Sequence, residues 1–281
     1  MKKRIVLFGL VLLTFSCQKP NNTINYVLDN YTSGAVLRTI GSTGEFNYYA
    51  PNESIFKLTI EEHDKENGDL MEDVEVFLSF NKGTEIKYKT LNPSDFQTGP
   101  TGLPRTDLEI SLAEATSLLG ISSSQYSGGD AIGIRFKLNL TDGRTFSTGE
   151  VTGSMTGSYF KSPYEYSKII KCIPLGAIAG IYTVKMVDSY GDGWNGASVI
   201  VTVDGVEKSF TVSAEQGATN TEVVTIPEDA TSMSFEYSKG DWDAEVSYSI
   251  EFTKLDGTAS QTAISDGPTP AVGELTLSIC Q

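Results

Sequence analysis

Apolar side chains alternate with polar ones along most of the chain, with the two-residue period that places them on one face of a β-strand. The clearest runs cover residues 132–140 and 246–252. Glycine, asparagine, aspartate and proline separate the runs, and long amphipathic helical segments are nearly absent. One short helix is expected, because Ser111 and Glu114 form a capping box ahead of apolar residues that end at Gly120. The pattern therefore predicts an all-β protein.

The apolar runs fall into two groups, and the second group is the denser. Seven short runs follow one another in about a hundred residues, which is typical of a β-sandwich. The boundary between the groups is expected between Ser162 and Gly176, which gives domains at residues 27–170 and 171–281. The seven runs begin near Tyr182, Val199, Phe210, Val224, Met233, Val246 and Leu275.

The N-terminus has the pattern of a secretory signal peptide. Basic residues at positions 2–4 precede an apolar stretch, residues 5–13, that is too short to span a bilayer as a helix. The sequence leading to Cys17 resembles the lipobox of bacterial lipoproteins. That resemblance implies removal of residues 1–16 and diacylation of Cys17, and such a lipid anchor holds a protein stably on a membrane. Residues 17–26 are then the lipidated cysteine and a short polar tether.

The charge of the chain argues against several classes of function. The sequence has 21 Lys and Arg against 36 Asp and Glu, and loss of the three basic residues of the leader changes the net charge from −15 to −18. Nucleic-acid binding is not expected, because it needs a basic surface. The single histidine, His63, excludes a multi-histidine zinc site. The acidic residues 61–69 around it are expected to form a solvated hairpin loop. Anionic lipids would repel the body of the protein, which should stand off the membrane.

The number of cysteines is consistent with an exported protein. If Cys17 carries lipid, Cys172 and Cys280 remain as an even pair in an oxidising compartment. A disulfide between them would join the start of the second domain to its last strand. The alternative is that both are unpaired buried cysteines.

Two loops of the second half carry many oxygen-bearing side chains. Residues 187–197 also contain three glycines that let the backbone curl, and residues 240–245 supply a second acidic group. Calcium takes about six to eight oxygen ligands, which the two loops would supply if they meet at one end of the sandwich. The alternative is that both are ordinary tight turns, in which Asp-Gly and Asn-Gly are favoured. The expected metal ligands are Asp188, Asp192, Asn195, Asp241, Asp243 and Glu245.

The run DSYGDGWNG at residues 188–196, together with GDWDAE at 240–245, resembles a β-sandwich module appended to many secreted bacterial proteins and some eukaryotic ones. The resemblance covers about residues 178–256. It implies a non-catalytic extracellular module that calcium stabilises, and it does not fix a ligand.

Three segments of the first half, YTSGAVLRT at 31–39, LNLTDGRTFS at 138–147 and FKSPYEY at 160–166, resemble accessory surface lipoproteins of Bacteroidota. Such lipoproteins are often found beside starch-utilisation-type transport systems. The resemblance implies an outer-membrane lipoprotein with an immunoglobulin-like N-terminal domain. It supplies no catalytic residue and leaves open whether the protein faces the surface or the periplasm.

The two tryptophans, Trp194 and Trp242, both lie in the acidic loops, and Tyr190 is close by in sequence. One interpretation makes these rings a platform on which a sugar stacks, with the acids accepting hydrogen bonds from its hydroxyls. The other has each indole plugging the end of the sandwich and fixing its loop.

Taken together, the sequence predicts two β-sandwiches, immunoglobulin-like or jelly-roll-like, behind a lipoprotein signal peptide. The expected function is that of a non-catalytic accessory or binding module at the outer membrane, for a glycan, a peptide or a partner transporter. A structural subunit of a larger outer-membrane complex is the alternative. A hydrolase that uses two carboxylates is a further one, but no G-x-S-x-G or H-E-x-x-H motif occurs.

Overall fold

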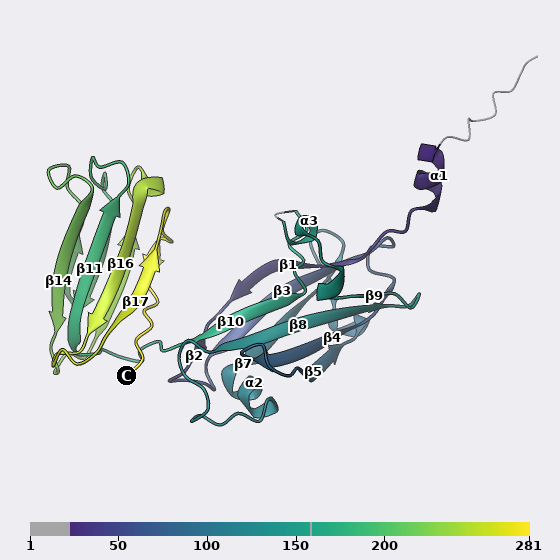
Figure 1. Ribbon diagram of the computed structural model, residues 1–281, viewed down its shortest axis with the longest axis horizontal. Coiled ribbons are helices and arrows are strands. Elements are labelled where there is room, and N and C mark those ends of the chain that lie inside the picture. Colours follow the sequence, from purple (N-terminus) through teal and green to yellow (C-terminus); the bar gives the residue numbers. More distant parts are fainter. Residues whose placement is uncertain (1–22, 158) are drawn as a thin grey trace, which may run out of the picture. The chain divides into compact units, whose positions relative to one another are not determined.

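The computed structural model describes residues 23–157 and 159–281. Nearly all regular structure in these residues is β-strand, arranged in two sandwiches, which confirms the all-β prediction (Figure 1). The predicted signal peptide, Cys17 and most of the predicted tether lie outside the described residues. No helix in the described part of the chain is long and apolar enough to cross a bilayer.

The first sandwich has two sheets that share one hydrophobic core. One sheet has the strand order β1 (Val36–Thr43), β3 (Ile55–His63), β7 (Pro104–Ser111) and β6 (Gln97–Thr98). The other has the order β2 (Phe46–Asn47), β10 (Glu165–Lys171), β8 (Ala131–Leu140), β4 (Met71–Phe80) and β5 (Ile86–Leu91), with β9 (Thr145–Phe146) paired to β8. The short helices are α2 (Leu112–Leu118), α3 (Gly153–Thr156), and the 3₁₀ turns η1 (Pro93–Asp95) and η2 (Thr148–Glu150).

Local sequence determines several of these elements as predicted. Every second residue of β8 from Ile132 to Leu140 is buried, which is the expected two-residue period. The β8–β9 turn contains Gly143, whose φ of 84° favours glycine. Helix α2 begins with the predicted capping box, in which the Ser111 hydroxyl accepts a hydrogen bond from the Glu114 amide and the Glu114 carboxylate accepts one from the Ser111 amide.

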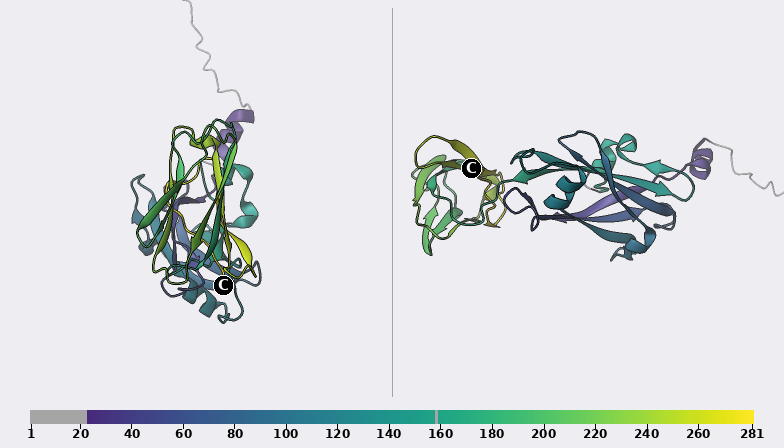
Figure 2. Two further views of the ribbon diagram at one scale, coloured as in Figure 1. Left: turned by 90° about the vertical axis from the view of Figure 1, so that its left-hand side faces the viewer. Right: turned by 90° about the horizontal axis from the view of Figure 1, so that it is seen from below.

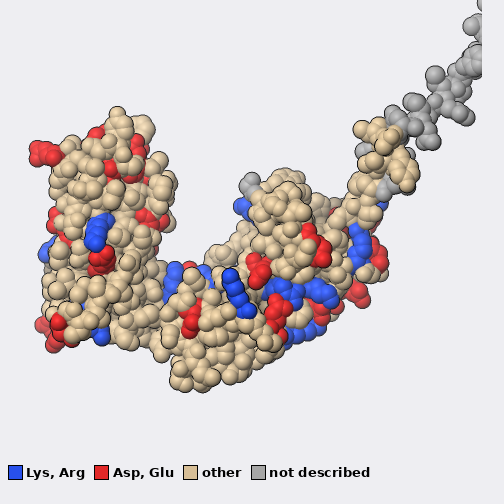
Figure 3. Space-filling model, viewed as in Figure 1, with Lys and Arg blue, Asp and Glu red and all other residues tan. Residues whose placement is uncertain are grey.

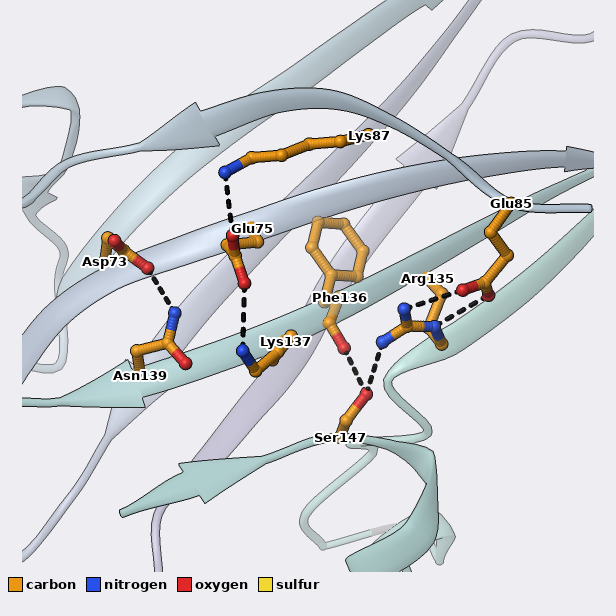
Figure 4. Close-up of polar contacts among 9 residues, drawn as sticks. All are labelled: Asp73, Glu75, Glu85, Lys87, Arg135, Phe136, Lys137, Asn139 and Ser147. Carbon is orange, nitrogen blue, oxygen red and sulfur yellow. Dashed lines mark hydrogen bonds and ion pairs between the residues drawn. The ribbon is translucent and has the colours of Figure 1, made fainter. Parts of the chain in front are cut away.

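Ion pairs cross the outer face of β5, β4 and β8 (Figure 4). Glu75 on β4 accepts hydrogen bonds from Lys87 (2.7 Å) and Lys137 (3.1 Å) on the neighbouring strands, and these bonds lower the pKa of Glu75 to about 2. Arg135 donates two hydrogen bonds of 2.7 Å to Glu85. Each of these cations faces a carboxylate, so the face is a solvated, charge-paired surface.

The prediction of a solvated hairpin loop at residues 61–69 is wrong. Strand β3 extends to His63, and Glu61 and Glu62 are fully buried. The segment that follows crosses to β4 in the other sheet and is therefore no hairpin. Burial of Glu61 is compensated by ion pairs with Arg38 (2.9 Å) and Arg105 (2.7 Å), and the pKa of this carboxyl falls overall although burial by itself raises it.

Glu62 has a different environment from its neighbour. It occupies an inward position of β3, and neither of its carboxyl oxygens has a hydrogen-bond partner among the described residues. Burial, with a smaller contribution from Asp64, raises the pKa of Glu62 to about 8. The carboxylate of Asp64 is itself held by the backbone amides of Glu66, Gly68 and Leu70. Glu62 is therefore a neutral acid at neutral pH, buried beside a carboxylate.

The second sandwich encloses a separate core between two antiparallel sheets, seen nearly end-on in the right-hand view of Figure 2. One sheet has the order β14 (Thr219–Ile226), β11 (Gly180–Asp188), β16 (Val246–Thr253) and β17 (Ser260–Asp266). The other has the order β13 (Val206–Phe210), β12 (Ser198–Val203), β15 (Met233–Ser238) and β18 (Gly273–Glu274). The 3₁₀ turn η3 (Asp243–Glu245) precedes β16.

The last segment of the chain differs from the predicted strand. Only β18 is regular, yet Leu275, Leu277 and Ile279 are buried with the alternation that suggested a strand. The reason is that the segment passes from one sheet to the other, since the amide of Leu275 bonds to Phe235 on β15 and that of Ser278 bonds to Ala263 on β17. Strand β17 itself was not predicted.

The predicted disulfide between Cys172 and Cys280 is confirmed. A backbone hydrogen bond joins the same two segments, in which the Ile279 amide donates to the Cys172 carbonyl (2.8 Å). Gly128 of the first sandwich lies against the bond, and a Cβ placed there would be 2.3 Å from each sulfur. Tyr49, also of the first sandwich, donates to the Ile279 carbonyl (2.9 Å). The disulfide therefore closes the second sandwich where the two sandwiches adjoin.

Ahead of the sandwiches, helix α1 (Thr23–Asn30) occupies part of the segment expected to be a tether. This helix was not predicted, because the segment is polar in composition. Ile24 and Val27 are three residues apart, and Tyr31 follows four residues after Val27, which is the spacing of one helical side.

We predict that the stability of the protein falls as the pH rises from about 4.5 to about 8. In this window the unfolded chain ionises Glu62 while the folded chain keeps it protonated, so unfolding releases a proton. The slope is at most about 1.4 kcal/mol per pH unit for one proton. Urea unfolding at several pH values should show this slope in the wild type and not in Glu62→Gln. The exposed Glu66→Gln variant serves as a control, and an unchanged slope in Glu62→Gln would contradict the assignment.

We also predict that loss of the disulfide destabilises the second sandwich. The bond closes a loop of 108 residues, for which chain-entropy models give about 4–5 kcal/mol. Denaturant unfolding of a Cys172→Ala, Cys280→Ala variant should match that of the reduced wild type, with a midpoint below that of the oxidised protein. Equal midpoints for oxidised and reduced protein would show that the bond contributes nothing.

Candidate metal centre

The two predicted loops meet at the end of the second sandwich where β11 finishes and β16 begins (Figure 1). Gly240 lies against the other loop, since a Cβ there would approach the amide of Ala197 at 2.5 Å and the carbonyl of Asn195 at 2.8 Å. The amide of Asp241 donates to the same Asn195 carbonyl (3.2 Å). The first loop is curled tightly, and Gly193, with a φ of 96°, packs so closely on Ser213 that no larger residue fits.

Three carboxylates converge at this end. Asp188, Asp192 and Glu245 each present an oxygen within 4.8 Å of the other two. Asp188 is buried at the end of β11, Glu245 closes η3, and Asp192 is exposed at the tip of the first loop. Carboxylate oxygens from separate loops at this spacing are the ligand type that Ca²⁺ prefers.

Backbone amides hold Asp188 in place. One of its oxygens accepts a hydrogen bond from the amide of Tyr190 (3.0 Å) and the other from the amide of Gly193 (2.7 Å). Each carboxylate oxygen has two lone pairs, so both oxygens keep capacity for another partner. Partial burial, and then the charges of Asp188 and Asp192, raise the pKa of Glu245. The cluster thus carries mutually repelling negative charge that a cation would offset.

Asp241 and Asp243 are not part of this carboxylate cluster, and the Asn195 side chain adjoins it through Asp192. The Asn195 side chain donates to Asp192 (2.9 Å) and to the Gly193 carbonyl (2.8 Å), so it positions one ligand candidate. Asp243 accepts hydrogen bonds from the hydroxyl of Tyr237 (2.7 Å) and from the Gly240 amide, which gives it a role in shaping the second loop. Asp241 is exposed, and its backbone rather than its carboxylate joins the loops.

The aromatic residues of the loops have separate roles. Trp194 is 1% exposed, packs edge-on against Tyr237, and donates its indole N–H to the Val187 carbonyl (3.0 Å), so it plugs the sandwich and is not available to a ligand. Trp242 is 61% exposed and Tyr190 is 74% exposed. The plug interpretation is therefore right for Trp194 and wrong for Trp242.

A groove adjoins the cluster. It starts at Asp192 and Asn195, passes Ser198 at the start of β12 and Ser209 near the end of β13, and ends at residues 211–214. Backbone and small side chains form most of its wall, and hydroxyl groups are frequent among them. The hydroxyl-bearing residues are Ser198, Ser209, Thr211 and Ser213.

Charge distinguishes the second sandwich from the first. Residues 172–281 contain four lysines, no arginine and sixteen Asp and Glu. On the face of the second sandwich seen in Figure 3, red acidic atoms exceed blue basic ones. Such a negative field raises the local concentration of cations.

Comparison with known proteins does not assign the chain to a family. No protein-family model matches it, and a search of curated proteins finds no significant match.

We predict that replacing the two tryptophans changes the free energy of unfolding by very different amounts. Trp194→Ala removes a buried ring and should lower the free energy of unfolding by about 3–5 kcal/mol. Trp242→Ala removes an exposed ring and should change it by less than about 0.5 kcal/mol. Chemical denaturation followed by circular dichroism measures both. A large loss of stability in Trp242→Ala would mean that this ring also anchors its loop.

Proposed function

We propose that the protein is a lipid-anchored, non-catalytic binding protein of the outer membrane, whose second sandwich binds Ca²⁺ and presents a surface for a glycan. The observation that carries the calcium part is the convergence of Asp188, Asp192 and Glu245 from two loops. The surrounding excess of acidic residues supports a cation. The signal-peptide pattern and the lipobox resemblance at Cys17 support the anchor.

The glycan part rests on the surroundings of the cluster. Trp242 and Tyr190 expose their rings on the two loops, and a groove rich in hydroxyl groups begins at Asp192. Aromatic faces pack against the C–H groups of a sugar, while hydroxyls and carboxylates exchange hydrogen bonds with its hydroxyls. A calcium ion at the cluster would fix both loops and thereby the positions of these rings. A transporter partner at the membrane is compatible with this role.

Calcium binding is tested by thermal unfolding of the chain from residue 18, with Ca²⁺ and with chelator. An ion that binds only the folded state adds about 2.7 kcal/mol at a hundred times its dissociation constant, so Tm should rise. The rise should disappear in Asp192→Ala. Asp229→Ala is the matched control, because residue 229 is exposed in the β14–β15 loop at the opposite end of the same sandwich and should leave the rise unchanged. Equal melting temperatures with Ca²⁺ and chelator would contradict the calcium site.

Glycan binding is tested by gel retardation on a panel of polysaccharides with Ca²⁺ present. We expect retardation by at least one polysaccharide, and we expect Trp242→Ala to abolish it without unfolding the protein. Leu255→Ala replaces an exposed apolar side chain at the other end of the sandwich and should bind normally. Calcium binding without any retardation would instead favour a structural subunit of a membrane complex.

A further inference from the structure

Helix α1 exposes a short apolar stripe. Ile24, Val27 and Tyr31 recur at the spacing of one helical side, and each is more than half exposed. Tyr31 directly follows the last helical residue, and no regular element begins before Val36 on β1. An isolated helix of eight residues is marginal in water, so its stability depends on a surface that receives the stripe.

We propose that this stripe lies in the polar–apolar interface of the bilayer, so that α1 is a second membrane contact beside the lipid. The proposal rests on the lipid anchor of the proposed function. The surface that receives the stripe is the lipid bilayer rather than another protein.

Chain length places the helix at this surface. Thr23 is six positions after Cys17, and a fully extended chain over six positions spans at most about 20 Å. The diacylated cysteine would itself lie at the level of the head groups. Helix α1 therefore starts within about 20 Å of the interface.

Charge also makes this segment better suited to contact the lipid surface than the rest of the protein is. Residues 18–34 contain one lysine, Lys19, and one acid, Asp29, and are neutral. The whole net charge of −18 of the mature chain thus belongs to the residues that follow. Anionic head groups repel those residues more strongly than the neutral segment of residues 18–34. Tyrosine, moreover, is enriched at membrane–water interfaces, where Tyr31 would lie.

The depth of the helix can be measured by nitroxide labelling of single cysteines. Cys17 is blocked by lipid, and Cys172 and Cys280 are bonded to each other, so Ile24→Cys or Val27→Cys provides the one free thiol. The labelled, lipidated protein is reconstituted in vesicles of phosphatidylethanolamine and phosphatidylglycerol. Collisions of each nitroxide with oxygen, which partitions into lipid, are compared with collisions with a water-soluble nickel chelate.

Tyr26→Cys is the matched control. Residue 26 is exposed and lies about 200° around the helix from residue 24, on its other side. We expect the oxygen-to-nickel collision ratio to be several times higher at positions 24 and 27 than at position 26.

Three other outcomes overturn the proposal in distinguishable ways. If mass spectrometry shows lipid on Cys17 but positions 24, 26 and 27 collide equally with nickel, the helix lies in water and only this inference fails. If positions 24 and 27 are shielded from both reagents, a protein surface covers the stripe, and loss of the shielding on dilution would identify a second copy. If Cys17 carries no lipid, the anchor fails and this inference fails with it.

Discussion

Carboxylates held within 4.8 Å of one another repel, and the loop end of the second sandwich brings three of them together. Two backbone amides stabilise Asp188, but among the described ion pairs none involves Asp192 or Glu245. The remaining ways to offset the repulsion are a proton on Glu245, whose pKa is raised, or a bound cation. A cation would also join the loop after β11 to the turn before β16. Trp242 lies on the second loop and the groove begins at Asp192, so both adjoin this cluster.

The first sandwich compensates buried acids in two other ways. Glu61 is paired with Arg38 and Arg105, so it stays ionised with little exposure to water. Glu62, its neighbour in sequence, has no such partner and is held as a neutral acid beside Asp64. Ion pairing with arginine is not available at the loop cluster, because no arginine occurs in residues 172–281. A proton on Glu245 or a bound cation remains, and this contrast with Glu61 supports the proposed cation.

Two features predicted correctly from sequence are set by local rules, namely the alternation in β8 and the capping box at Ser111. The disulfide between Cys172 and Cys280 was also predicted correctly, from the even number of cysteines that remain if Cys17 carries lipid. The errors arose where the burial of a side chain depends on residues that are distant in sequence. Composition made residues 61–69 look solvated, because the arginines that neutralise Glu61 lie far away in sequence. Likewise the two tryptophans sit in similar acidic loops, and only packing against Tyr237 shows that Trp194 is buried and Trp242 is not. The convergence of carboxylates from two loops likewise depends on strand pairing.

The most direct test of the calcium site is a crystal structure of the protein grown with Ca²⁺, with the ion located by its anomalous scattering. We predict one ion bound by oxygens of Asp188, Asp192 and Glu245 at about 2.3–2.6 Å, with carbonyls or waters completing about six to eight ligands. A structure at saturating Ca²⁺ with only water between these carboxylates, and with Trp242 and the loops unchanged, would contradict it.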